Sequence, residues 1–266
     1  MEWSFTAAGS VRAEVEVPCG SIEVSPSAAG EVTVELEATH PGSTRSIEAI
    51  ESAEVSLHGD RLQVRVGQRG RRARLFSRDL EVSCRIAMPE GASLSVTTAS
   101  ADVTCTLALA DFTANVASAD VTLGRVDGAV ELVSASGDLR CESAGSLGVK
   151  GASADVSVRR VSGPVDVKVA SGDVAIEDAG SSVRMKSASG DLELGSVSAG
   201  DVTFDTASGD IRIGVAAGAA AHLDVTTVSG ELRCDLPMSE TAPESAALRI
   251  ACRSVSGDVT IASATA

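Results

Sequence analysis

The chain has 266 residues, of which 44% are hydrophobic, 22% are charged and only 2% are aromatic. This length and hydrophobicity suffice for a buried core, which excludes the intrinsically disordered class. The formal net charge of −15 at pH 7 argues against nucleic acid or an anionic membrane as a direct ligand.

The first 97 residues have β-strand character without a regular spacing. Met1–Thr6 lacks the basic and apolar stretches of a signal peptide, and no later window comes near 18 uninterrupted apolar residues. Alternation of apolar and polar residues predicts strands over 11–17, 32–37, 53–57, 61–66 and 80–86. We interpret residues 1–97 as a β-rich N-terminal cap, or as degenerate first coils of a repeat that is regular from residue 98.

A basic cluster interrupts this acidic segment. It consists of Arg69, Arg71, Arg72, Arg74 and Arg78. A solvated loop is the default interpretation. The alternative is a docking patch for an acidic partner, which includes another copy of the chain. No aromatic residues interleave with the arginines, so a nucleic-acid site is not predicted here.

From residue 98 onward the chain repeats. The tetrapeptide Ser-[Gly/Ala]-[Asp/Glu]-[Val/Leu/Ile] occurs nine times, at intervals of 18, 18, 17, 18, 18, 19, 21 and 27 residues. Its acidic members are Asp102, Asp120, Asp138, Asp155, Asp173, Asp191, Asp210, Glu231 and Asp258. A period of this regularity indicates a repeat architecture.

Most repeats hold two apolar-polar-apolar triplets, such as 156–158 and 165–167, about nine residues apart. Such a unit cannot bury its apolar face alone, whereas in-register stacking places each strand about 4.8 Å from its counterpart in parallel. The sequence therefore predicts an all-β fold: a parallel β-solenoid of 18-residue coils over 98–266, with a loop insertion at 236–246. Parallel crossovers favour a right-handed coil. An antiparallel sandwich is the rival fold, although it would need no constant period.

In-register stacking predicts columns of equivalent side chains. One interior column contains Cys105, Leu123, Cys141, Val158, Ile176, Leu194, Ile213, Cys234 and Ile261. One exterior column contains Lys150, Lys168 and Lys186. The column of small residues before each acidic residue indicates crowding at a corner.

Six cysteines occur without any CxxC pair, and only three histidines are present, so a structural zinc site is not predicted. Cys105 and Cys141 would lie two coils apart, about 9.6 Å, which is too far for a disulfide. Free buried thiols fit a reducing compartment, so we expect a cytoplasmic protein.

Stacked carboxylates at the corners would repel one another by about 1 kcal/mol per neighbour even in water. Hydrogen bonds from corner amides and nearby Ser hydroxyls would offset this repulsion. Calcium between coils is the alternative. No cofactor is predicted.

At the C-terminal end, residues 236–245 account for the 27-residue interval and form either a tolerated insertion or a binding loop. No amphipathic helix follows the last strand triplet, 259–261. We expect this final coil to be an open edge, with Val259 and Ile261 as candidates for self-association.

The run from Leu80 to Val96, which leads into the Ser-[Gly/Ala]-Asp-Val repeats, resembles the bacterial β-strand-repeat family labelled "putative adhesin". The resemblance implies a β-repeat architecture of unknown function. It implies no catalytic residues.

These features predict a non-catalytic cytoplasmic scaffold or protein-interaction module that associates with itself through an end coil. One alternative is an acidic mimic of nucleic acid that binds a basic protein groove. Another is a glycan-binding or glycan-active β-helix. An enzyme is not expected. Every corner carries a carboxylate, so no pair of carboxylates stands out as a catalytic pair, and sugar-stacking aromatic residues are scarce.

Overall fold

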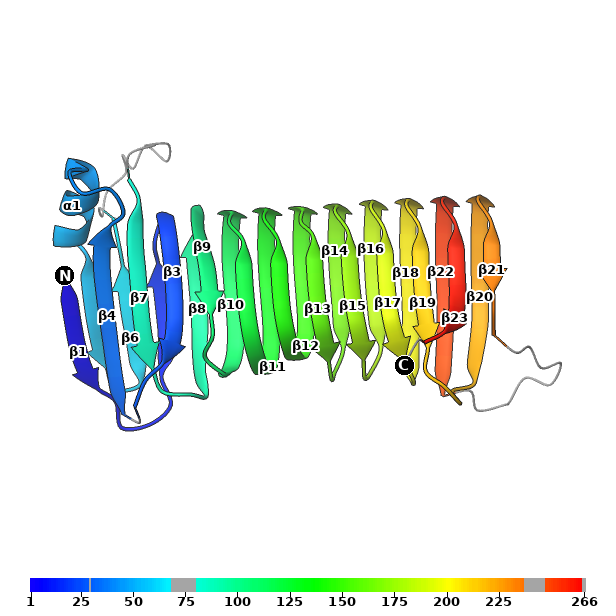
Figure 1. Ribbon diagram of the computed structural model, residues 1–266, viewed down its shortest axis with the longest axis horizontal. Coiled ribbons are helices and arrows are strands. Elements are labelled where there is room, and N and C mark those ends of the chain that lie inside the picture. Colours follow the sequence, from blue (N-terminus) through cyan, green and yellow to red (C-terminus); the bar gives the residue numbers. More distant parts are fainter. Residues whose placement is uncertain (29, 68–79, 237–246, 265–266) are drawn as a thin grey trace. The chain divides into compact units, whose positions relative to one another are not determined.

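The computed structural model describes residues 1–28, 30–67, 80–236 and 247–264 (Figure 1). In this part of the chain, strands account for all regular structure except one helix, α1 (Thr44–Glu51). No helix there is long and apolar enough to cross a membrane. Two compact units are present: Met1–Gly128 with Leu132–Gly137, and Ala129–Glu131 with Asp138–Ala266.

The first unit contains two sheets. Its strands are β1 (Glu2–Thr6), β2 (Arg12–Glu16), β3 (Cys19–Pro26), β4 (Glu31–Ala38), β5 (Glu54–His58), β6 (Arg61–Arg65), β7 (Val82–Met88), β8 (Ala92–Thr98), β9 (Ser100–Cys105), β10 (Leu109–Ser118) and most of β11 (Val121–Ser136). One sheet has the order β1–β4–β7–β3–β9–β11. The other has the order β5–β6–β2–β8–β10. The pairs β1–β4, β4–β7 and β5–β6 are antiparallel, and the other pairs are parallel.

The earliest coil of the chain is interposed between later ones. Strand β2 lies between β6 and β8, and β3 lies between β7 and β9. The N-terminal segment therefore combines antiparallel strands with parallel coils. Its division from the repeats at residues 97 and 98 stays a prediction.

Helix α1 was not predicted from the sequence. Ser43 caps it, because the backbone N–H of Ser46 donates to Ser43 Oγ at 3.2 Å. The helix packs on β4 and buries Ala49 and Ile50.

The second unit consists of stacked coils. Its strands are β12 (Leu139–Ser153), β13 (Val156–Val161), β14 (Val165–Ser171), β15 (Val174–Ala179), β16 (Val183–Ser189), β17 (Leu192–Val197), β18 (Gly200–Ser208), β19 (Ile211–Val215), β20 (Ala221–Ser229), β21 (Leu232–Cys234), β22 (Leu248–Ser256) and β23 (Val259–Ser263). One sheet has the order β12–β13–β15–β17–β19–β23–β21. The other has the order β12–β14–β16–β18–β22–β20.

Every strand pair in these two sheets is parallel. The parallel β-solenoid is therefore confirmed, and the antiparallel sandwich is wrong for this unit. The right-handed sense of the coil stays a prediction.

The spatial order of the last coils differs from their order in the sequence. Strands β22 and β23, the last of the chain, lie between β18/β19 and β20/β21 (Figure 1). The chain therefore builds the outermost coil first and then returns to fill the position inside it. The expectation that the final coil forms the open edge is wrong.

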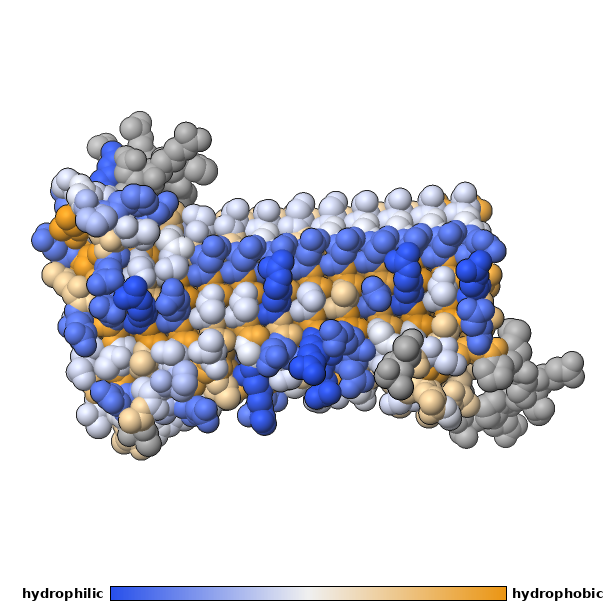
Figure 2. All heavy atoms as spheres, viewed as in Figure 1, coloured by the Kyte–Doolittle hydropathy of each residue, from blue (hydrophilic) through white to orange (hydrophobic). Residues whose placement is uncertain are grey.

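The predicted columns are present within each unit. Cys105 pairs with Leu123, and Cys141, Val158, Ile176, Leu194 and Ile213 follow one another in register. Only the last two members are exchanged, because Ile261 precedes Cys234 in space. Lys150, Lys168 and Lys186 also stack as predicted. Figure 2 shows polar side chains in rows that cross successive strands, as in-register stacking requires.

Candidate interaction surfaces

The acidic corner residues form a hydrogen-bonded ladder. In the second unit, Oδ1 of each Asp accepts the backbone N–H of the acidic residue in the adjacent coil. The donor–acceptor distances are 3.2 Å for Asp155 on Asp138, 2.9 Å for Asp173 on Asp155, 2.8 Å for Asp191 on Asp173, 2.8 Å for Asp210 on Asp191, 3.0 Å for Asp258 on Asp210 and 2.8 Å for Glu231 on Asp258. In the first unit, Asp120 donates to Asp102 in the same way at 3.0 Å.

These hydrogen bonds offset the repulsion between the stacked carboxylates. A hydrogen bond to a charged group contributes about 1.5–3 kcal/mol, which exceeds the repulsion of about 1 kcal/mol between neighbours in water. The other carboxylate oxygen, Oδ2, of some corner Asp residues forms an ion pair. Arg212 lies 3.1 Å from Asp210 Oδ2 and 3.5 Å from Asp191 Oδ2. The predicted corner-amide bonds are confirmed, so the Asp ladder has a structural role.

Metal binding would require several ligands around one point. Among the described residues, no group of three or more His, Cys, Asp or Glu side chains could hold a metal ion. Calcium binding to the ladder therefore has no support from a preformed ligand set.

Glycine in the corner column is required by a close approach between coils. Gly209 has φ +133°, and a Cβ built on it would lie 2.1 Å from the carbonyl oxygen of Gly190. The predicted crowding is confirmed, and the left-handed backbone adds to the preference for glycine.

The exposed end of the second unit is the coil made of β20 and β21, which we call the end coil. Among the described residues, β20 pairs only with β22 and β21 only with β23. Leu232 is consequently 49% exposed, whereas its register partner Val259 is fully buried. Leu223 and Val225 are likewise only half-buried. The apolar interior of the solenoid therefore opens at this coil.

The end coil also turns main-chain groups to the open side. The carbonyls of Ser229 and Glu231 accept N–H groups of the neighbouring coil, at 3.0 and 2.9 Å, and the N–H of Asp235 donates to Ile261 O at 2.9 Å. Alternate residues of a parallel strand direct their main-chain groups to opposite edges. The residues that direct N–H and C=O outward are therefore His222, Asp224, Thr226 and Val228 in β20, and Leu232 and Cys234 in β21.

The structure corrects the residues predicted for this edge. Val259 and Ile261 are fully buried, and β23 has a strand partner on each side. Their repeat positions were identified correctly, but the chain returns inside the end coil. Leu232, Leu223 and Val225 occupy the exposed position instead. The signal that could have indicated this is the 27-residue interval, which leaves enough chain for the return.

The other predicted interaction residues are Arg69, Arg71, Arg72 and Arg74. They lie outside the described residues, as does Arg78.

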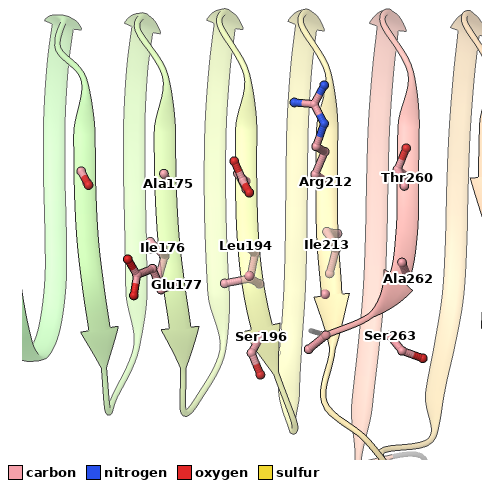
Figure 3. A pocket seen from close by; sticks show the side chains of 15 residues that line it. Ala175, Ile176, Glu177, Leu194, Ser196, Arg212, Ile213, Thr260, Ala262 and Ser263 are labelled. Atoms are coloured by element: carbon pink, nitrogen blue, oxygen red, sulfur yellow. The ribbon is translucent and has the colours of Figure 1, made fainter. Parts of the chain in front are cut away.

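A shallow hollow of about 700 Å³ lies on the outer face of the sheet that contains β15, β17, β19 and β23 (Figure 3). Gly195 and Gly214 are among the residues that line it, and a Cβ on Gly195 would lie 2.7 Å from the carbonyl oxygen of Glu177 in the neighbouring coil. Glu177, Glu193 and Arg212 stand at its margins.

The cysteines behave as small apolar residues. All six are unpaired, and Cys84, Cys105, Cys141 and Cys252 are buried. Burial raises the pKa of the Cys84 and Cys252 thiols to about 12, and that of the Cys105 and Cys141 thiols to about 11. These four thiols are therefore protonated at neutral pH and are poor nucleophiles.

Comparisons with known proteins assign the chain to a family. No curated protein matches the chain. Among solved structures, a "putative adhesin" from Bacteroides fragilis is 11% identical, with a TM-score of 0.40, 98% of this chain covered and 96% of the other. A "putative cell adhesion protein" from Clostridium sporogenes is 8% identical, with a TM-score of 0.26 and 99% of each chain covered. The family described as Toastrack DUF4097, a domain of unknown function, matches residues 13–264. Since this match spans both units and all the stacked coils, the chain belongs to the Toastrack DUF4097 family.

Proposed function

We propose that this chain is a non-catalytic protein-interaction module whose binding surface is the end coil. The observation that carries the proposal is the combination of two strand edges that have no partner strand among the described residues and an apolar interior that opens at Leu232. An unpaired edge accepts a strand from another chain through main-chain hydrogen bonds, and neighbouring side chains add specificity.

The proposal includes a reducing cellular location, namely the cytoplasm. Six unpaired cysteines support it, because an oxidising compartment favours disulfides. Lysing cells in a denaturant that contains an alkylating reagent would test it. Alkylation of all six thiols is expected, and disulfides that survive in the freshly lysed cells would contradict it.

The two alternatives from the sequence, a nucleic-acid mimic and a glycan-binding or glycan-active protein, are less well supported by the described residues. The acidic surface is interrupted by arginines in ion pairs, such as Arg140 with Asp138 and Arg160 with Asp178, which makes a poor mimic of a continuous phosphate backbone. The hollow on the sheet face has no aromatic lining for a sugar.

The test compares two lysine substitutions with matched exposure. Leu232→Lys places a charge on the open edge, whereas Val133→Lys does so at a side chain that is 50% exposed and far from the end coil in sequence. Tagged chains would be used to recover partners from cells, including untagged copies of the chain. Partners should be recovered with the wild type and Val133→Lys, and recovery should fall by about tenfold or more with Leu232→Lys. Equal recovery with all three chains would contradict the proposal.

A further inference from the structure

We infer that the partner of the end coil is a second copy of this chain, paired antiparallel across a two-fold axis to give a closed dimer. This inference rests on the proposed function, because it specifies what occupies the same edge. Three observations carry it. They are the positions on β20 and β21 whose main-chain N–H and C=O groups point to the open edge, the charges of the exposed side chains on these strands, and the residue at which the Asp ladder ends.

On β20, a two-fold axis at Val225 brings outward N–H groups of one copy opposite outward C=O groups of the second copy. Asp224 and Thr226 both direct N–H and C=O to the open edge, and an axis at Val225 sets Asp224 opposite Thr226 of the second copy. In an antiparallel pair such residues exchange two hydrogen bonds. Val225 then lies opposite Val225 of the second copy, and Leu223 lies opposite Thr227 of the second copy. No like charges are opposed along this strand.

On β21, an axis at Cys234 sets Arg233 opposite Asp235 of the second copy. The two-fold symmetry also sets Asp235 opposite Arg233 of the second copy, so the pair forms twice. Both side chains are exposed, so the two opposite charges meet on the outer surface. The inward Leu232 then faces Leu236 of the second copy. Val225 and Cys234 lie five residues before and four residues after Gly230, so one axis through both sheets can pass near both residues.

The end of the Asp ladder argues against a head-to-tail filament. In the inner coils of the second unit, the corner Asp carboxylate accepts the N–H of the corner residue in the next coil outward. The end coil is the one coil of the repeat whose corner residue is a glutamate, Glu231. Its carboxylate lies one methylene farther from the main chain, so it does not reproduce the acceptor position that another parallel coil requires. Antiparallel pairing at the open edge needs no such acceptor, and it closes after two copies.

The test exploits this self-complementary charge pattern. Arg233→Asp leaves acidic residues at both positions, and Asp235→Arg leaves basic residues at both. In either homodimer, two like-charge pairs are opposed, which should weaken dimerisation by about tenfold or more. Mixing the two variants restores two opposite-charge pairs, so the mixture should form a heterodimer with near-wild-type affinity.

Sedimentation velocity over a concentration series would measure these equilibria, and Arg159→Asp is the control. Arg159 is an exposed outward residue of the inner strand β13, and its substitution changes the net charge by the same amount as Arg233→Asp. The expected results are a wild-type dimer, an Arg159→Asp dimer, two weakened variants and a restored mixture.

Three results would overturn the inference: a monomeric wild type, assemblies larger than dimers, or a mixture that stays monomeric. If the wild type is monomeric while Leu232→Lys still abolishes recovery of a different protein, the inference fails and the proposed function stands. If Leu232→Lys also changes nothing, both fail.

Discussion

At the scale of single residues, the Asp ladder explains why Ser-Gly-Asp recurs. The carboxylate must stand where the next coil presents its N–H, and Asp is the acidic residue with the shorter side chain. The preceding residue must be small, since a Cβ on Gly172 would lie 2.2 Å from the carbonyl oxygen of Ala154. The repeat motif is therefore a stacking motif, which is why it specifies the fold and not a reaction.

Removing one carboxylate from the ladder should destabilise the stack. Asp191 accepts the N–H of Asp210 at 2.8 Å, and we expect Asp191→Ala to lower the free energy of unfolding by about 1–2 kcal/mol. Asp191→Asn keeps an acceptor oxygen and should cost less. Urea unfolding of both variants would measure the difference, and an equal loss in the two would assign the effect to something other than this hydrogen bond.

The buried thiols make stability depend on alkaline pH. Burial raises the pKa of Cys252 to about 12 in the folded state, above its value in the unfolded chain, so the folded state retains a proton that the unfolded state loses. This stabilisation is complete below the pKa of the unfolded thiol, near pH 9, and declines as the pH rises toward 12. In that window, each such thiol lowers the free energy of unfolding by up to about 1.4 kcal/mol for every unit that the pH rises.

Urea unfolding at pH 8 and pH 10 would compare the wild type with Cys252→Ala. The variant should be less stable at pH 8 but should lose less of its stability between the two pH values. An identical loss in both proteins would show that Cys252 does not titrate as described.

At the scale of strands and coils, the sequence predicted the strands better than their connectivity. The strand triplets, the parallel pairing and the interior column from Cys141 to Ile213 follow from an apolar-polar alternation that repeats every 18 residues. The position of β22 and β23 does not follow from it, because Val259-Thr260-Ile261 and Leu232-Arg233-Cys234 have the same alternation. Either triplet satisfies the core, so periodicity cannot decide which one is flanked on both sides.

The same limit applies in the first unit. Alternation identified the strand at 11–17, but Val15 pairs in register with both Val64 and Val96, two partners distant in sequence. Such pairing depends on contacts that no local pattern encodes. The open edge at the end coil was missed for this reason, since the expected edge was Val259 and Ile261.

Paired truncations of equivalent side chains would test the order of the last coils. Ile261 is fully buried, so Ile261→Ala should cost about 2–4 kcal/mol of unfolding free energy. Leu232 is 49% exposed, so Leu232→Ala should cost clearly less, about 1 kcal/mol. If the coils followed the order of the sequence, the two costs would be reversed. Thermal or urea unfolding would distinguish these outcomes.

At the scale of the whole molecule, the net charge of −15 opposes the approach of two copies. The Debye length shortens from about 30 Å at 0.01 M salt to about 8 Å at 0.15 M, which screens this long-range repulsion. The proposed dimer should therefore tighten by several fold over that range, even though the exposed Arg233–Asp235 pairs are themselves screened. Sedimentation at both salt concentrations would measure the change, and a dimer that weakens with salt would point to an interface dominated by ion pairs.

The return of the C-terminal segment has a consequence for how the protein is synthesised. Residues 221–234 leave the ribosome before residues 248–263, at a time when the edges of β18 and β19 are still vacant. The early segment carries the same alternation and can occupy that place temporarily, until the late segment arrives and displaces it outward. Completion of the second unit thus waits for residues 248–263, so folding should include a slow rearrangement after that segment has left the ribosome.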